Sequence, residues 1–324
     1  MLVSCTEIKK ASMEKASHSN GVVINRLDKL ETDFILNESS VSMQEMALAY
    51  PEEARILIED VLRIGSVDDR DIESKLKSYF TTNSARLQLI KDVSRKYDNL
   101  GVYGKQLKNA FTKLQAEIPG MHIPQFYAQI SGFNQSIVVG DSILGISLDK
   151  YMGTDYEPYS QFYYQRQIDQ MRPSHIVGDC LYFWLESKNP PRFSKEVPLL
   201  DVLLHFGKIN WIVWHILGDD FRSGKKLYYL KSGKSSEGEW EEMASKLLSK
   251  DVLTLTDEQA IHYILFGMPG KKYPKFKGLQ GVGVPAGMKI IDDYMRLHPQ
   301  CTLQQLLAED NSAHILQGAG YTTK

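Results

Sequence analysis

Histidines are the residues whose spacing first raises a question of chemistry, because His205 and His215 both fall in the most apolar run of the chain. A zinc-binding helix places two histidines four residues apart, with a glutamate beside the first to take a proton from bound water. Here Phe206 and Ile209 stand at the glutamate and second-histidine positions. His215 is no substitute, because ten residues of helix displace it by about 15 Å, whereas ligands of one zinc ion lie within about 4 Å of each other. The sequence therefore predicts no metal at His205, no catalytic residue and no cofactor.

The element that carries both histidines is predicted to be a central helix over residues 198–218. Pro198 suits the first helical position, and Gly218 suits the left-handed residue that ends a helix. At about 100° per residue, Leu203 and Trp214 fall on a broad apolar side. A narrow arc opposite carries the polar side chains Asp201, His205, Lys208 and His215. We interpret this arc as a candidate groove or partner surface, and its charges argue against a helix that spans a membrane.

The composition describes an ordinary globular protein. The chain has 324 residues, of which 43% are hydrophobic, so it can bury one large core or two modest ones. A net charge of −2 gives no argument for nucleic acid as a partner. The three cysteines are too few for a disulfide framework and show no metal-binding spacing.

The first residues match the end of a bacterial lipoprotein signal. Leu2, Val3 and Ser4 occupy the positions before Cys5, the residue that receives lipid in such a signal. The basic and apolar parts of the signal are not in the sequence, so either the true start lies upstream or the match is a coincidence. Residues 6–20 are polar and of low complexity, as in a flexible tether. We therefore expect lipidation at Cys5, a tether within residues 1–20, and a single mainly helical domain over 21–324.

That domain is predicted to be α+β and mainly α-helical, with one small β-sheet. The N-terminal half reads as successive helices, of which the first is expected over Val22–Leu36. Three short runs rich in β-branched residues follow, at Gln125–Ile130, Ser136–Val139 and Ile143–Leu148. Gly140 and Asp141 suit a hairpin turn between the last two. A sheet of about three strands within 125–148 is therefore expected before the central helix.

Several segments in one order resemble the gliding-motility lipoproteins of the GldB type. They are Ser131–Asn134, Gly145–Leu148, Lys150–Gly153 with Asp155, Tyr156 and Tyr159, His205–Ile209, Trp240 with Leu247–Ser249, Gly287 to Met295, and Leu303 to Tyr321. The resemblance covers residues 125–324 well and the N-terminal helices loosely. It implies a lipoprotein of the cell envelope, facing the periplasm or the cell surface, with the membrane and other envelope proteins as partners.

The same resemblance implies a zincin-like domain, in which a small sheet precedes the helix that carries the metal ligands. Because the glutamate and the second histidine are missing, we expect a non-catalytic structural or assembly component, in effect a pseudoenzyme. Two alternatives stay open. One is a zinc metallopeptidase-like hydrolase that combines His205 with Glu237, Glu239 or His262; the other is a peptide-binding envelope protein that uses the polar arc.

Overall fold

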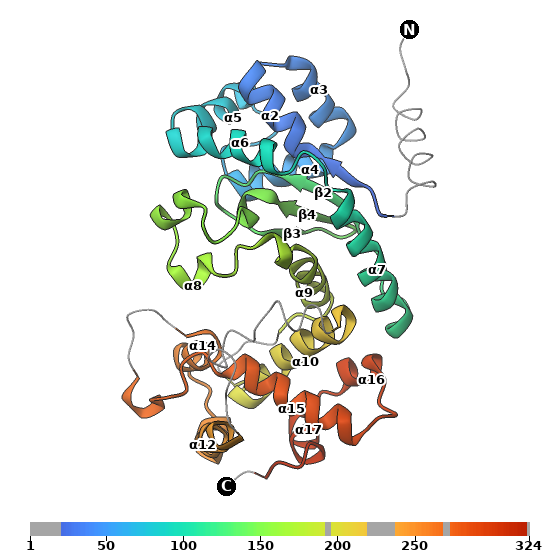
Figure 1. Cartoon of the computed structure of the whole chain (residues 1–324), viewed down its shortest axis with the longest axis vertical. Helices are drawn as coiled ribbons and strands as arrows, with labels where there is room; N and C mark the ends of the chain where they lie inside the picture. The colour runs from blue at the N-terminus through green and yellow to red at the C-terminus, as the bar shows by residue number, and fades with distance from the viewer. Residues whose placement is uncertain (1–20, 192–195, 219–236, 268–272, 323–324) are drawn as a thin grey trace. The chain divides into compact units, whose positions relative to one another are not determined.

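The computed structural model describes residues 21–191, 196–218, 237–267 and 273–322 (Figure 1). The chain divides into two compact units. The first unit contains the residues up to Thr112 together with His122–Trp184, and the second contains Lys113–Met121 together with the residues from Leu185 onward. The range 21–324, expected as one domain, is thus built from two such units. No described helix is both long enough and apolar enough to cross a bilayer.

The first unit is built on one mixed sheet, whose strand order is β1-β2-β4-β3. Its strands are β1 (Ile24–Arg26), β2 (Gln125–Gln129), β3 (Ile137–Val139) and β4 (Ile143–Ser147). β1, β2 and β4 are parallel, whereas β3 pairs antiparallel with β4 through the predicted hairpin turn. The prediction of a mainly helical chain with one small sheet is confirmed.

The fourth strand corrects the prediction of a helix over Val22–Leu36. Ile24–Arg26 is extended and pairs with β2, and helix α2 (Leu27–Asn37) begins only at Leu27. Val22, Val23 and Ile24 are β-branched, which suits a strand, but a local sequence pattern carries no sign of a partner about a hundred residues away.

Helices make up most of the rest of the first unit. Those of the first unit are α2, α3 (Ser40–Ala49), α4 (Pro51–Arg55), α5 (Ile72–Thr81), α6 (Ser84–Lys96), α7 (Gly101–Glu117), the short α8 (Gln165–Ile168) and α9 (Ile176–Lys188); α7 and α9 continue into the second unit, and a π-helical turn at Ile56–Leu62 extends α4. The side chain of Asn83 caps α6 by accepting hydrogen bonds from the amides of Ala85 and Arg86.

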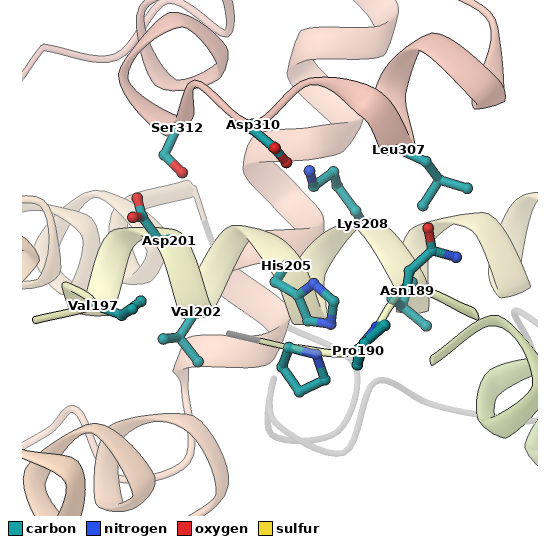
Figure 2. Close-up of a pocket in the computed structure, with 12 residues that line it drawn as sticks. Asn189, Pro190, Val197, Asp201, Val202, His205, Lys208, Leu307, Asp310 and Ser312 are labelled. Carbon is teal, nitrogen blue, oxygen red and sulfur yellow. The ribbon is translucent and has the colours of Figure 1, made fainter. Parts of the chain in front are cut away.

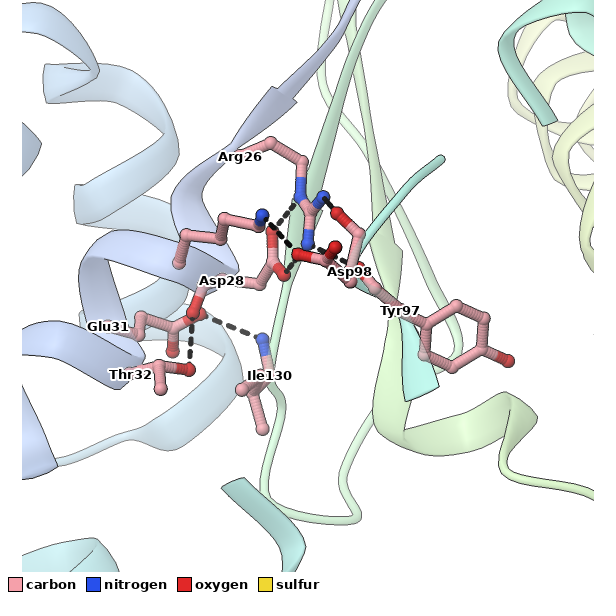
Figure 3. Close-up of polar contacts among 8 residues, drawn as sticks. Arg26, Asp28, Glu31, Thr32, Tyr97, Asp98 and Ile130 are labelled. Atoms are coloured by element: carbon pink, nitrogen blue, oxygen red, sulfur yellow. Dashed lines mark hydrogen bonds and ion pairs between the residues drawn. The ribbon is translucent and has the colours of Figure 1, made fainter. Parts of the chain in front are cut away.

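An arginine fixes the junction of β1 and α2 (Figure 3). The guanidinium of Arg26 donates two hydrogen bonds to the carboxylate of Asp28, at 2.8 and 2.7 Å. It also donates to the carbonyl oxygens of Tyr97 and Asp98, which follow α6. One turn further along α2, the buried carboxyl of Glu31 accepts a hydrogen bond from the amide of Ile130, just after β2. The start of α2 is therefore tied both to the sheet and to the α6–α7 connection.

The segment Ser131–Asn134, one of those that carried the resemblance, is a loop held by a buried aspartate. Asp149, directly beyond β4, accepts hydrogen bonds from the amides of Ser131 and Phe133 and from the hydroxyl of Ser131. Burial raises the pKa of Asp149, and these hydrogen bonds oppose the rise. Gly132 and Phe133 both have positive φ angles, of 61° and 73°, so the loop depends on these contacts to hold its shape.

The second unit is organised around α10 (Leu199–Leu217), which confirms the predicted central helix. Pro198 is its N-cap, and Gly218 ends it with a φ of 74°. Its other helices are α12 (Glu237–Leu247), α13 (Lys250–Leu253), α14 (Glu258–Phe266), α15 (Gly283–Leu297), α16 (Leu303–Ala308) and α17 (Ser312–Gly318).

Helices α10 and α15 touch backbone to backbone where two glycines meet. A Cβ atom added to Gly207 would lie 2.5 Å from the carbonyl carbon of Gly287. One added to Gly287 would lie 2.2 Å from the carbonyl oxygen of Leu203 and 3.1 Å from the Cα of Gly207. No larger residue fits at Gly207 or Gly287 without separating the two helices. The close crossing therefore fixes how α10 lies against α15.

Candidate functional site

The polar side of α10 opens onto a pocket of about 500 Å³ within the second unit (Figure 2). We call it the α10 pocket. The residues that line it are Asp201, Val202, His205, Lys208 and Ile209 from α10, Asn189, Pro190, Pro191 and Val197 from the chain before it, and Leu307, Asp310 and Ser312 from α16, α17 and their connection. Figure 2 shows Lys208 extending toward Asp310, while Asp201 and Ser312 face each other farther along the helix.

Three of the four residues of the predicted polar arc meet in this pocket. Asp201, His205 and Lys208 are four and three residues apart, a spacing that places them on one side of a helix. His215 does not join them. It lines a second pocket of about 770 Å³, where its ring stacks on that of Trp211 with centroids 5.1 Å apart and its Nε2 lies 3.9 Å from a carboxylate oxygen of Glu117.

The side of the α10 pocket that is formed by α16, α17 and their connection was not predicted from the sequence. Asp310 and Ser312 come from a polar connection in which Asn311 caps α17 by accepting a hydrogen bond from the amide of His314. The run Glu309-Asp310-Asn311-Ser312 reads as a helix start, but nothing in the sequence states which helix it will face.

Lys208, on the arc predicted to be a groove or partner surface, is a buried cation. Its side chain is only 8% exposed, and its Nζ donates a hydrogen bond of 2.9 Å to the carbonyl oxygen of Glu309. Burial lowers the pKa of Lys208, and the nearby carboxylates of Asp310, Glu309 and Asp201 oppose that change. The ammonium therefore links α10 to the connection between α16 and α17.

His205 is a half-buried imidazole that stays neutral at physiological pH. Burial, together with a smaller effect from the positive charge of Lys208, lowers its pKa to about 4. Its Nε2 atom is buried and has no hydrogen-bond partner among the residues that the structure describes. A neutral imidazole offers one donor and one acceptor, so the hydrogen-bonding capacity of the Nε2 atom is unused among the described residues, in a side chain that lines the α10 pocket.

Comparison with known protein families supplies the wider context. A family described as gliding motility protein GldB matches residues 8–323. The chain belongs to this family. The match confirms the resemblance found in the sequence. No curated protein and no solved structure matches the chain.

In this GldB-family chain, the positions that a zinc helix would use are occupied by packing side chains. Phe206 is 4% exposed, and its ring packs edge to face on Phe266, with centroids 5.0 Å apart. Ile209 is 1% exposed. His262, named as a candidate ligand, places its ring 5.1 Å from the same Phe266, whereas the side chains of Glu237 and Glu239 lie outside the described residues.

A metal would therefore need ligands that the described part of the second unit does not bring together. Among the described residues, no group of three or more His, Cys, Asp or Glu side chains is placed to hold a metal ion. The polar groups around His205 are the ammonium of a lysine, which donates, the carboxylates of two aspartates, which accept, and a serine hydroxyl and an asparagine amide, which do both. This set suits hydrogen bonding to a polar ligand better than zinc coordination, which favours cysteine and histidine. Cys5, the predicted lipid site, also lies outside the described residues.

Proposed function

We propose that this GldB-family protein is a non-catalytic lipoprotein of the bacterial cell envelope and acts as a structural or assembly component of gliding motility. Membership of the family supports the motility role and the envelope location. The observation that carries the non-catalytic assignment is the α10 pocket, which is lined by a neutral His205 and by Lys208. The positions where a zinc helix has its glutamate and second histidine are held by Phe206 and Ile209, which are buried. We further propose that the domain is related to the zincins. It would share their order, a small sheet before the helix that carries the metal ligands, but lack the glutamate and the second histidine.

The α10 pocket is the proposed contact site for a segment of a partner envelope protein. It combines an unpartnered imidazole nitrogen with the carboxylate of Asp201, the hydroxyl of Ser312 and the amide of Asn189. A peptide backbone alternates donors and acceptors, and this mixture of groups can pair with both kinds. The pocket is also large enough for a few residues of an extended chain.

The experiment compares the two histidines of α10. His205→Ala and His215→Ala are expressed in gliding cells that lack the native protein, and the envelope proteins that co-purify with each variant are measured. His205→Ala is expected to reduce partner recovery while His215→Ala, in the other pocket, leaves it unchanged. Equal recovery from both variants would remove the α10 pocket from the proposal.

Elemental analysis separates the proposed role from that of a metallopeptidase-like hydrolase. The purified protein is expected to carry no stoichiometric zinc. One zinc per chain, lost in His205→Ala, would overturn the non-catalytic assignment and direct the search for further ligands to Glu237, Glu239 and His262.

Cys5 is the proposed attachment point, motivated by Leu2-Val3-Ser4-Cys5 and the polar stretch that follows. When the gene is expressed from its native locus, the protein is expected to partition into detergent and to incorporate labelled fatty acid. Cys5→Ala should abolish the label, since stable anchoring depends on the acyl chains. Label retained by Cys5→Ala would refute the site.

A further inference from the structure

The first described residues, Gly21 and Val22, pack closely against helix α7. The amide of Val22 donates a hydrogen bond of 3.0 Å to the carbonyl oxygen of Gly104, in the first turns of that helix. The contact is close on both sides, because a Cβ atom on Gly104 would lie 2.5 Å from the carbonyl oxygen of Val22 and one on Gly21 would lie 2.8 Å from the carbonyl carbon of Gly104. The described chain therefore begins at one fixed place on the first unit, beside the start of α7 (Figure 1).

Apolar side chains are exposed at that same place. Val102, in the first turn of α7, is 66% exposed, and Val23 is 42% exposed. Between the two segments lies a groove of about 330 Å³, lined by residues that include Gly21, Val22, Val23, Leu100 and Lys105.

Basic side chains continue the surface along α7. Lys105 and Lys108 follow Val102 at intervals of three residues, so they share the outward side of the helix, and both are exposed. From Gly101 to Ala116 the sequence of α7 contains no acidic residue. The exposed acid next to the groove, Asp98, is paired with Lys29 at 3.0 Å. We call Val23, Val102, Lys105 and Lys108 the α7 face.

We infer that the α7 face docks on the surface of the bilayer to which the lipid at Cys5 anchors the protein. This inference rests on the proposed lipid anchor. Valines that enter the boundary between headgroups and acyl chains, flanked by lysines that meet anionic headgroups, are the features of a surface that binds in the membrane interface.

The anchor alone cannot orient the protein. Fifteen residues lie between Cys5 and Gly21, and a fully extended chain over that interval can span up to about 55 Å. Because the lipid keeps the first unit near the membrane, even a weak surface contact becomes effective at the resulting high local concentration. Docking through the α7 face would fix which side of the first unit meets the membrane.

The test uses the full chain carrying Cys5→Ala, so that no acyl chain contributes to binding. Co-sedimentation is measured with vesicles of phosphatidylcholine and phosphatidylglycerol, and with vesicles of phosphatidylcholine alone. We expect binding to the anionic vesicles that weakens on adding salt. A lysine near an anionic surface is worth about fivefold in partitioning, so Lys105→Glu with Lys108→Glu should lower partitioning by about 25-fold or more.

The matched control exchanges an exposed valine elsewhere in the same unit. Val41, on α3, is 72% exposed, so Val102→Glu and Val41→Glu change the same surface chemistry at two places. Binding should fall in Val102→Glu and persist in Val41→Glu, with unchanged circular dichroism for both. No binding of the parent chain to anionic vesicles, or equal losses in the two variants, would overturn the inference. Either result would leave the acylation test of Cys5 unaffected.

Discussion

The crossing of α10 and α15 at Gly207 and Gly287 allows the stability of the second unit to be tested by adding a single methyl group. In Gly287→Ala the new Cβ would start 2.2 Å from the carbonyl oxygen of Leu203. Carbon atoms and their neighbours pack at about 3.5 to 4.0 Å, so the two helices must separate by at least about 1 Å. The obstructing atoms belong to the backbone, which cannot swing aside as the end of a side chain can.

The expected loss of stability is the difference between two effects. Overpacking a core costs about 1 to 3 kcal/mol, and a clash between backbones belongs at the upper end of that range. Alanine is a better helix former than glycine by about 1 kcal/mol, which offsets part of the cost. The net loss for Gly287→Ala should therefore be about 2 kcal/mol or more, equivalent to a fall in Tm of about 4 to 8 °C.

Calorimetric unfolding measures this loss, and Gly101→Ala is the control. The Cβ atom added at Gly101 would approach only the side-chain oxygen of Asn99, at 3.0 Å, so the change should stay within about 1 kcal/mol. Gly207→Ala should resemble Gly287→Ala, and the double variant should lose less than the sum, because one separation of the helices accommodates both methyl groups. Unchanged or increased stability of Gly287→Ala would refute the reasoning.

Two further measurements concern α10. Trp211 is 6% exposed and donates a hydrogen bond to Asp292, whereas Trp214 is only half-buried. The free energy of unfolding should therefore fall by about 3 to 5 kcal/mol in Trp211→Ala and by clearly less in Trp214→Ala. Equal losses of stability in urea unfolding would contradict this order. The depressed pKa of His205, about 4 against an ordinary value of 6.5, predicts that the imidazole stays neutral in NMR titration down to about pH 5. Since the unfolded chain takes up the proton first, the contribution of His205 to stability is present above about pH 6.5 and is lost as the pH falls toward 4, a dependence that His205→Asn should remove.

The fold was predictable where local patterns and local partners agree. The central helix carries its own start and stop signals in Pro198 and Gly218, and the hairpin of β3 and β4 closes through adjacent residues. The strand at Ile24–Arg26 was missed because its partner, β2, is distant in sequence, and three residues show too little periodicity to separate a strand from the first turn of a helix. Tertiary pairing decided the structure there.

The candidate site was predictable in part for a similar reason. Helical spacing grouped Asp201, His205 and Lys208, which line one pocket, since that grouping depends on one element. It also included His215, which lines a different pocket, because a helical wheel ignores distance along the axis. It placed Trp214 on the apolar side, where the structure leaves it half-buried, because a helical wheel does not show where neighbouring helices lie. The facing wall with Asp310 and Ser312, and the burial of Lys208 against Glu309, follow from the packing of α16 and α17.

The parallel pairing of β1 with β2 also sets an order for folding. Ile24 pairs with Phe126, so α2 to α7 all lie in the sequence between the two strands, and β4 must follow before the parallel part of the sheet is complete. During synthesis, β1 is made well before β2 and has no partner until about a hundred further residues have followed. Contacts within the helices form quickly, whereas pairing between distant strands forms slowly. A chain that stalls before Gln125 therefore carries helices with exposed apolar sides and no complete sheet to pack on, and such exposed apolar surface is prone to aggregation.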